Sequence, residues 1–403
     1  MNFSLQEADA RPTKVLVIDV ERIPKYIDSL EHYKRAFILI QVNGRPVGQV
    51  LCPIRDGRLA GSELKDAILP VARWSLIENR VHDFLGWREE HLRYVPGDQS
   101  TVAVCTRDRP DDLFRCLTAL HCMPDDGQEI LVIDNCPRTD ESKRIVEKFP
   151  GVRYVVEPTP GASAARNRAL QEARHDIVAF SDDDAAPSPG WLRALVRGFK
   201  EPSVMCVTGL TLPLELETPA QVWFELHTPF GRGYKRFATE MTDGNPLNVA
   251  RIGTSANMAL RKAVIDYVGP FDEALGPGTR CKTGEDFDMF SRILTSGYRI
   301  IYDPDALSWH RHRRQWTELR RTVYGYGVGV YAYLIKQALC NREFSAASVA
   351  YGWARHIQIP ALLRSLRGGP SGKPLDILLA EICGCLIGPL AYLLSRNERA
   401  RRQ

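Results

Sequence analysis

Three consecutive carboxylates, Asp182, Asp183 and Asp184, follow Ser181, which comes directly after a short apolar run at residues 177–180. Carboxylates this close repel one another unless a cation neutralises them. Oxygen ligands of this kind suit a hard divalent ion such as Mg²⁺ or Mn²⁺. A solvated acidic turn is the ordinary alternative for an aspartate cluster. Because the cluster follows an apolar run, the metal site is favoured, and we predict a divalent ion here.

A second acidic pair, Glu285-Asp286, follows Gly284 and precedes apolar residues at helical spacing. The pair would therefore occupy the N-terminus of a helix, where the helix dipole favours the ionised carboxylate. A carboxylate held there can take a proton from an acceptor hydroxyl, as a general base does. Simple helix capping is the alternative, and the pattern alone does not separate the two.

Two histidines stand close together in the segment Trp309-His310-Arg311-His312, just past the strand-like residues 299–303. Neutral imidazole is a good ligand for ions such as Mn²⁺. Most isolated histidines have structural roles, but one near a triple-aspartate site is a stronger ligand candidate. The sequence does not choose between His310 and His312.

Polar residues also follow the first three expected strands, which precede the aspartate cluster in the sequence. Thr106, Asp108 and Arg109 close the first strand, Asp134 closes the second, and Arg166 lies in the helix after the third. An arginine at a helix N-terminus suits a diphosphate, because the guanidinium and the backbone amides act together. Each turn taken singly is an ordinary polar turn. As an ordered set on successive strands, they indicate a site for a base, a ribose or a phosphate.

The spacing of these residues is set by alternating strands and helices between residues 98 and 315. Such alternation predicts an α/β fold with a mostly parallel sheet covered by helices on both faces. Ligands of such sheets bind beyond the carboxyl ends of the strands, where the polar residues fall. We expect strands at 101–105, 130–133, 152–156, 177–180 and 204–210, and helices at 111–122, 139–149, 162–173 and 190–200.

The region before this core, residues 1–97, has a different character. It holds β-rich stretches and a helical stretch at 61–85, and Asn43-Gly44 between two apolar runs is a strong hairpin signal. Nothing in it resembles a catalytic motif. We expect a small α+β accessory domain that packs on the rest or binds a partner.

The region after the core, residues 316–403, is predicted to be helical, with apolar stretches at 323–339 and 375–394 flanked by arginines. The second stretch has the roughly 20 residues that a bilayer-spanning helix needs. Asp376, Glu381 and Pro389 weaken that interpretation, because a central acid costs about 2.5–3.5 kcal/mol on insertion. A helical pair packed on the catalytic domain is the second interpretation. We favour the third, helices on a membrane surface with arginines at anionic lipid headgroups.

The composition is that of a folded globular protein. The length of 403 residues suggests two or three domains, and hydrophobic and charged contents of 44% and 25% are ordinary. A net charge of +4 does not indicate a nucleic-acid partner. The ten cysteines form no CxxC pair, and the first residues lack the pattern of a secretory signal. We therefore expect reduced thiols and a cytoplasmic protein, either free or peripheral on the cytoplasmic membrane face.

With these features together, the sequence resembles family 2 glycosyltransferases of the GT-A fold. Eight segments match the family's motifs in the family's order, over about residues 101–315. They read VAVCTRDRP, ILVIDN, GASAARNRAL, FSDDDAAP, GTSANMALRK, GPFDEALG, GEDFDMFSRIL and SWHRHRR. The resemblance implies inverting transfer of a sugar from a UDP-, GDP- or dTDP-sugar to an acceptor hydroxyl. The acceptor would be a glycan, a lipid-linked molecule or a small metabolite.

The resemblance also implies roles for individual residues. Mn²⁺ or Mg²⁺ would be bound by Asp182, Asp184 and His310, with Asp183 meeting the ribose or the metal. Asp286 would be the catalytic base, beside Glu285. The other implied positions contact the nucleotide (Thr106, Asp108, Arg109, Asp134 and Arg166) or shape the sugar and acceptor side (Trp191 and Asn257).

Some residues depart from the family pattern, and two rival functions stay open. Arg107-Asp108-Arg109 replaces the usual asparagine after the first strand, which leaves the base of the nucleotide open. The processive-synthase signature QxxRW is absent, because Trp316 directly follows Gln315, so we expect transfer of single sugars. A sugar-nucleotide nucleotidyltransferase would need a glycine-rich loop, which CTRDRP lacks. A non-catalytic sugar-binding or scaffold protein on the same fold is disfavoured by the intact acidic residues.

Overall fold

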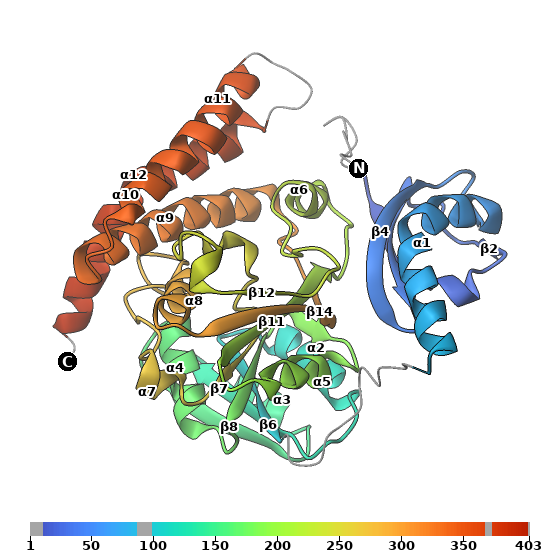
Figure 1. Cartoon of the computed structure of the whole chain (residues 1–403). Coiled ribbons are helices and arrows are strands. Elements are labelled where there is room, and N and C mark those ends of the chain that lie inside the picture. Colours follow the sequence, from blue (N-terminus) through green and yellow to red (C-terminus); the bar gives the residue numbers. More distant parts are fainter. Residues whose placement is uncertain (1–10, 87–98, 367–372, 402–403) are drawn as a thin grey trace.

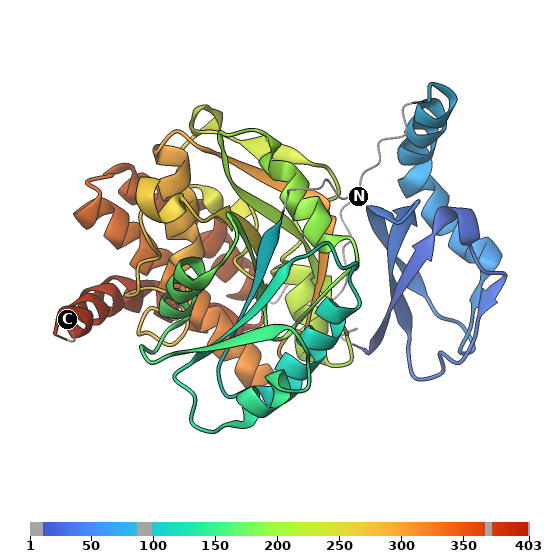
Figure 2. The same cartoon turned by 90° about the horizontal axis from the view of Figure 1, so that it is seen from below.

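The computed structural model describes residues 11–86, 99–366 and 373–401 and has three parts along the chain (Figure 1). A small N-terminal sheet with one long helix comes first, a large α/β part follows, and a group of helices comes last. The N-terminal part and the C-terminal helices lie on opposite sides of the central part (Figure 2). The expected domain boundary between residues 97 and 98 lies outside the described residues.

The N-terminal part is built on a three-stranded sheet. β1 (Thr13–Asp19) pairs in parallel with β3 (Arg35–Val42), and β3 pairs antiparallel with β4 (Arg45–Pro53). The expected hairpin is confirmed, since Asn43 and Gly44 link β3 to β4 with positive φ angles of 52° and 77°. Both residue types accept such angles, and the resulting turn matches the twist of the two strands.

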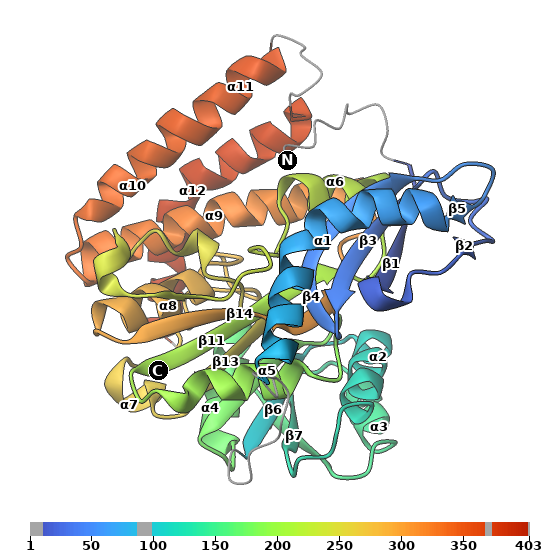
Figure 3. The ribbon, with the colours of Figure 1, turned by 45° about the vertical axis from the view of Figure 1, so that its right-hand side comes forward.

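The two faces of this sheet have different partners. α1 (Gly61–Phe84) covers one face (Figure 3), and its Leu64 and Ile68 are fully buried there. On the other face, Phe37 and Leu39 pack against apolar residues of the central part. The sheet is therefore a layer between α1 and the central part. Three short elements complete this region: η2 (Val20–Arg22), β2 (Tyr26–Ile27) and β5 (Leu59–Ala60).

The central part is a nine-stranded, mostly parallel sheet. Its strands are β6 (Ser100–Thr106), β7 (Glu129–Asn135), β8 (Val152–Glu157), β9 (Ile177–Asp182), β10 (Ala185–Pro187), β11 (Val204–Pro213), β12 (Phe237–Thr239), β13 (Asn257–Arg261) and β14 (Arg299–His310). Their order is β10-β14-β11-β13-β9-β6-β7-β8, with β12 paired to β14. β8, β7, β6 and β9 are parallel neighbours, as the alternation of strands and helices predicts. The expected α/β fold is confirmed.

Helices cover both faces of this sheet because apolar side chains alternate along its strands. On β6, Val102 and Val104 belong to one buried cluster and Ala103 to the other. The first cluster includes residues of α2 (Pro110–His121), α3 (Glu141–Val146), α5 (Trp191–Arg197) and η3 (Gly198–Lys200), and the second includes residues of α4 (Ala162–Glu172) and α8 (Glu285–Thr295). The remaining helices of this part are α6 (Pro219–His227), η4 (Met241–Asp243), η5 (Val249–Arg251) and α7 (Val264–Tyr267).

The far half of the sheet departs from the expected alternation. β13 runs antiparallel between β9 and β11, because the chain enters it from the carboxyl edge of β9 without a crossover helix. β14 continues to His310, well past the strand expected at 299–303, because it pairs with β11 and then with β10. In the near half, α3 is shorter than the helix expected at 139–149.

The last helices are α9 (Trp316–Cys340), α10 (Ser345–Trp353), the π-helical turn η6 (Ala354–Gln358), α11 (Ile359–Leu366) and α12 (Leu375–Ala400). α9 and α12 pack closely: a Cβ added at Gly384 would lie 2.2 Å from the carbonyl oxygen of Tyr324. α12 also reaches the loop before α8. The Tyr392 hydroxyl donates to Asp272 at 3.1 Å, and the Ser395 hydroxyl donates to the Ala274 carbonyl at 2.7 Å.

Candidate active site

The acidic cluster lies where β9 ends and the chain turns into β10. Ala185, the first residue of β10, pairs with His310 at the end of β14, and this pairing brings the histidine to the aspartates. Nε2 of His310 lies 3.1 Å from Oδ1 of Asp184. Ligand atoms of Asp182, Asp184 and His310 all lie within 4.8 Å of one another. Two carboxylates and an imidazole at this spacing suit a divalent ion such as Mn²⁺.

Nearby cations keep Asp184 ionised. Burial alone would raise the pKa of Asp184, but His310, Arg109 and Arg313 lower it below its usual range. Burial alone would lower the pKa of His310, but Asp184 raises it instead. A proton on Nε2 of His310 would therefore lie between the two residues, in the position from which a divalent ion could contact both. The donor set fits such an ion.

Asp183 is engaged differently from its two neighbours. Its carboxylate accepts hydrogen bonds from the Thr106 hydroxyl at 2.9 Å and from Arg109 Nη1 at 3.0 Å. The same guanidinium nitrogen lies 3.2 Å from Asp184. Burial and the adjacent Asp184 raise the pKa of Asp183 to about 7. Asp183 therefore has protein partners at the end of β6, whereas the family resemblance implies a side chain available to the ribose or the metal.

Arg166 of α4 joins the acidic cluster to the second acidic pair. Its Nη1 lies 2.8 Å from Oε1 of Glu285, and its Nη2 lies 3.6 Å from Oδ1 of Asp182. Arg166 and Glu285 are both buried. Burial and the adjacent Asp286 raise the pKa of Glu285 to about 7, against the effect of Arg166. This arrangement favours a positioning role for Glu285 over direct contact with substrate.

Asp286 lies in the first turn of α8 and is only half-buried. Its Oδ2 accepts a hydrogen bond from the Ser255 backbone at 3.4 Å, and its Oδ1 accepts one from the Phe287 backbone at 2.9 Å. Burial raises the pKa of Asp286 despite these bonds. Gly284 starts the helix with φ 99°, and a Cβ there would lie 2.5 Å from the Gly329 carbonyl oxygen. A partly exposed carboxylate with a raised pKa suits a general base.

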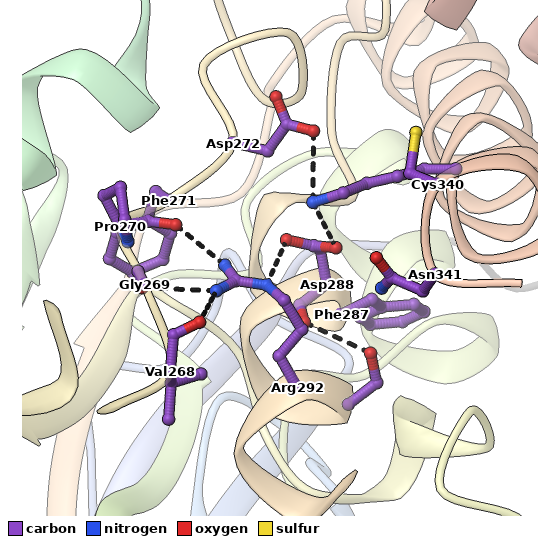
Figure 4. A network of polar contacts seen from close by, with 12 residues as sticks. Val268, Gly269, Pro270, Phe271, Asp272, Phe287, Asp288, Arg292, Cys340 and Asn341 are labelled. Carbon is purple, nitrogen blue, oxygen red and sulfur yellow. Dashed lines mark hydrogen bonds and ion pairs between the residues drawn. The ribbon is translucent and has the colours of Figure 1, made fainter. Parts of the chain in front are cut away.

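The buried side of α8 is held by a network of charges (Figure 4). Asp288 is fully buried and lies 2.9 Å from Nε of Arg292 and 2.6 Å from Nζ of Lys336. Lys336 comes from α9 and also lies 3.1 Å from Asp272 in the preceding loop. Arg292 donates hydrogen bonds to the backbone carbonyls of residues 268–270. α8, α9 and this loop therefore form one unit, which fixes the start of α8.

Comparison with known proteins assigns the central part. Residues 101–269 match the family described as glycosyl transferase family 2. This region is a family 2 glycosyltransferase domain. A pre-mycofactocin glycosyltransferase from Mycobacterium tuberculosis is 32% identical over 232 residues, 56% of this chain and 46% of that protein. Glycosyltransferase AglE from Haloferax volcanii is 23% identical over 255 residues, 61% of this chain and 78% of that protein.

The chain spans about half the length of the pre-mycofactocin glycosyltransferases it resembles. Among solved structures, the mannosyltransferase PcManGT from Pyrobaculum calidifontis, in complex with GDP-Man and Mn²⁺, aligns with a TM-score of 0.48 and 17% identity. That alignment covers 79% of this chain and 96% of PcManGT.

Two of the expected nucleotide residues of the glycosyltransferase domain lie at the carboxyl ends of β6 and β7. Asp134 is fully buried at the end of β7, where its Oδ2 accepts a hydrogen bond from the Tyr154 hydroxyl at 2.8 Å. Its Oδ1 is buried without a hydrogen-bond partner among the described residues. Burial raises the pKa of Asp134. Asp108 follows β6 with φ 53° and accepts a hydrogen bond from the Arg138 backbone at 3.0 Å.

The expected sugar and acceptor contacts of Trp191 and Asn257 are corrected by the structure. Both residues are fully buried. The Trp191 indole donates to the Asn257 side-chain oxygen at 2.7 Å, and the Asn257 nitrogen donates to the Leu210 and Ala306 carbonyls at 3.0 and 2.9 Å. Because buried polar groups need partners, this pair satisfies backbone groups between β11 and β14. Neither side chain lines the acidic edge.

The structure distinguishes the two histidines and places a further cation, Arg313, beside the aspartates. His312 lies 3.1 Å from Glu225, whereas His310 is the histidine grouped with Asp182 and Asp184. Arg313 lies 3.6 Å from Oδ2 of Asp184. The sequence signal that could have identified Arg313 as a residue of this site is its position three residues after His310 in SWHRHRR.

Proposed function

We propose that the chain is an inverting glycosyltransferase that uses a nucleotide-diphosphate sugar and a divalent ion. The observation that supports this most directly is the cluster of Asp182, Asp184 and His310, which Arg166 connects to Glu285 beside Asp286. A metal ligand set and a base candidate thus share one edge of the sheet. The same edge carries ligand sites in other α/β folds.

Asp182, Asp184 and His310 would hold Mn²⁺ or Mg²⁺, which when bound would neutralise charge on the leaving diphosphate. Arg313 and Arg109 flank the same carboxylates and supply further positive charge for the diphosphate. The unpaired Oδ1 of Asp134 offers an acceptor to the base of the nucleotide. Thr106 and Asp108 would border the nucleotide near Asp134. Arg166 would position Asp182 and Glu285 through its ion pairs.

Asp286 takes the proton from the acceptor hydroxyl as the oxygen attacks the anomeric carbon. The bond from that carbon to the diphosphate oxygen breaks as the new glycosidic bond forms, so the anomeric configuration inverts. One displacement suffices, and no second carboxylate is needed as a nucleophile. Glu285 does not take part in this step directly; its ion pair keeps Arg166 in position beside the site.

The two rival functions are disfavoured. The turn after β6 reads Thr106-Arg107-Asp108-Arg109 and has no glycine-rich loop, which a nucleotidyltransferase would need. A scaffold protein has no requirement for a half-buried carboxylate with a raised pKa at the start of α8. Named relatives are themselves called glycosyltransferases.

We also propose that the C-terminal helices lie on a membrane surface. α11 and α12 expose leucines, including Leu363, Leu366, Leu386 and Leu390, and Leu386 is 76% exposed. A single exposed leucine is ordinary on a protein surface, but several exposed leucines on neighbouring helices indicate an interaction surface. Within the described residues, α12 is the helix that meets the length and hydropathy of a membrane span, with a mean hydropathy of 2.1 and 39% of that window buried. Its other face packs on α9, which favours surface contact over spanning.

A panel of UDP-, GDP- and dTDP-sugars tests the proposed function. Thermal unfolding is measured with each donor, with and without Mn²⁺. A donor that binds the native state raises the melting temperature through RT ln(1 + [L]/Kd), so the correct donor stabilises the protein and its effect depends on the metal. Product analysis with that donor should show an inverted anomeric centre. Retention of configuration, or no metal-dependent donor binding across the panel, would contradict the proposal.

A further inference from the structure

The C-terminal half of α1 exposes a row of large apolar side chains. Trp74, Ile77, Val81 and Phe84 are 69%, 47%, 47% and 90% exposed. They follow one another at intervals of three or four residues, so they lie along one face of the helix. These four residues are called the outer stripe of α1 below.

The outer stripe faces away from the sheet that α1 covers. The buried residues of α1 end at Ala72, and the last turns of the helix extend beyond the strands of the N-terminal sheet (Figure 2). At 3.6 residues per turn, Val81 lies about 180° around the helix from Ala72. A single exposed apolar side chain is ordinary, but four in a row, two of them aromatic, indicate an interaction surface.

The intervals of the stripe are those of the a and d positions of a heptad, the pattern by which one helix pairs with another. With Trp74 at position a, Ile77 falls at d. Arg73 then falls at g and Glu78 at e, and both side chains are exposed beside the stripe. The Arg73 guanidinium lies 5.4 Å from the centre of the Trp74 ring. Charges at e and g set the partner and the orientation of a helix pair.

These charges favour a parallel pair of two identical helices. In a parallel pair, a g residue of one helix faces the e residue of the following heptad in the other, so Arg73 faces Glu78 of the partner subunit. The two-fold symmetry of such a pair provides this attraction twice. In an antiparallel pair, g residues face g residues, which would bring Arg73 close to Arg80 of the partner subunit. The sequence of α1 is thus complementary to itself in the parallel orientation.

We propose that the outer stripe is a dimer interface, in which α1 pairs in parallel with α1 of a second copy of this chain. The N-terminal part then serves as a dimerisation module. Two heptads bury less surface than a standard interface does, so the dimer should dissociate on dilution. The inference goes beyond the proposed sugar transfer, and no residue proposed to bind metal or nucleotide lies on α1.

Sedimentation velocity of the full chain, measured over a series of concentrations, tests the interface. The average mass of wild type should rise from 45.4 kDa towards twice that value. Ile77→Gln combined with Val81→Gln should weaken dimerisation at least tenfold. Both positions are exposed and glutamine is a good helix former, so the fold should be kept, which circular dichroism checks. Leu69→Gln, at a 44% exposed residue of α1 outside the stripe, is the matched control and should dimerise like wild type.

Charge reversal tests the orientation without changing the stripe. Arg73→Glu should weaken the dimer several-fold, because it places two carboxylates opposite each other at each flank. Adding Glu78→Arg should restore dimerisation, because it exchanges the two charges. In an antiparallel pair, Arg73→Glu would instead remove a repulsion and strengthen the dimer.

Three results would overturn the proposal. The first is a wild-type protein that stays monomeric at every concentration; if the stripe variant then sediments less with anionic vesicles, the stripe contacts a membrane instead. The second is a folded stripe variant that dimerises like wild type. The third is a stronger dimer of Arg73→Glu, which excludes the parallel pair. None of these measurements uses a sugar donor, so their outcome is separate from that of the proposed function.

Discussion

Asp184 and Asp286 occupy opposite electrostatic settings within one edge of the sheet. His310, Arg109 and Arg313 lower the pKa of Asp184, whereas burial raises the pKa of Asp286. A metal ligand must remain ionised, and a base must be able to accept a proton at the working pH. The two settings therefore agree with different roles for two residues of the same type.

Asp286→Asn should keep donor and metal affinity but lower turnover by about 10²–10⁴-fold, the usual contribution of a positioned general base. Because the pKa of Asp286 is raised, the wild-type rate should fall as the pH decreases, starting above the usual range of an aspartate. Single-turnover kinetics and a pH profile measure both. If Asp286→Asn loses donor binding while turnover per bound donor is unchanged, Asp286 has a structural role instead.

Asp184→Ala should abolish Mn²⁺ binding and metal-dependent donor binding, measured by calorimetric titration of each. Repulsion among the three aspartates by itself would make this variant more stable without metal. The structure indicates the opposite, because Arg109, His310 and Arg313 would each lose a carboxylate partner. We therefore expect a lower melting temperature. Asp111→Ala, an exposed aspartate at the start of α2, is the control; wild-type metal affinity in Asp184→Ala would refute the assignment.

The clustered carboxylates of the candidate metal site could be found from sequence because they are adjacent and follow an apolar strand. The choice of His310 over His312 could not, because it depends on the pairing of His310 with Ala185 and on Glu225, 87 residues away from His312. The burial of Trp191 was likewise not visible in the sequence. An aromatic residue after a loop has the same pattern whether it faces a ligand or the core.

At the scale of elements, α8 is where the C-terminal helices and the glycosyltransferase domain meet. At the start of α8, Gly284 lies against Gly329 of α9. One turn further along α8, Asp288 pairs with Lys336 of α9. The position of the proposed base therefore depends on a helix outside the residues 101–269 that match the family. A catalytic domain limited to those residues would lack both α8 and α9.

Lys336→Met should destabilise the protein by about 3–5 kcal/mol, because it leaves Asp288 buried without one of its cations. Methionine keeps most of the side-chain volume, so the effect reports the charge. Chemical denaturation measures the free energy of unfolding. Arg320→Met removes an exposed cation from the same helix and should change stability by less than about 0.5 kcal/mol. Equal effects of the two variants would show that the buried network does not stabilise α8.

The near half of the sheet was predictable because each strand there is followed by an amphipathic helix of its own. β6, β7, β8 and β9 match the expected strands closely. β13 was not predicted, because no alternation of strand and helix precedes it and its partners are distant in sequence. Local patterns determine local elements, whereas antiparallel insertion depends on contacts across the sheet.

For the whole molecule, the apolar face of α12 should determine vesicle binding. Leu386→Gln combined with Leu390→Gln should reduce sedimentation with anionic vesicles several-fold and leave donor binding unchanged. Raised salt should also weaken the wild-type interaction, because the exposed basic residues Arg396 and Arg401 are screened. Phe84→Gln, at an exposed apolar residue of α1, is the control.

Two outcomes would contradict surface binding. Negligible sedimentation of wild type with every vesicle would favour helices that only pack on the protein, and sedimentation that survives alkaline carbonate would favour a spanning helix. Point variants are needed, because deleting the chain after residue 369, which itself lies outside the described residues, would also remove Tyr392 and Ser395 from the loop before α8. We therefore do not expect such a deletion to leave the donor site intact.

The contacts of α12 with that loop also set an order of assembly. Tyr392 and Ser395 reach residues made 120 and 121 positions earlier in the chain. At about 5–20 residues per second, the ribosome needs about 6–24 s to make the intervening segment. During that interval, the loop before α8 lacks the two contacts that α12 supplies, and the proposed base follows directly after this loop. We expect a nascent chain to begin binding its donor only when α12 has been synthesised and has docked, well after the glycosyltransferase motifs themselves have left the ribosome.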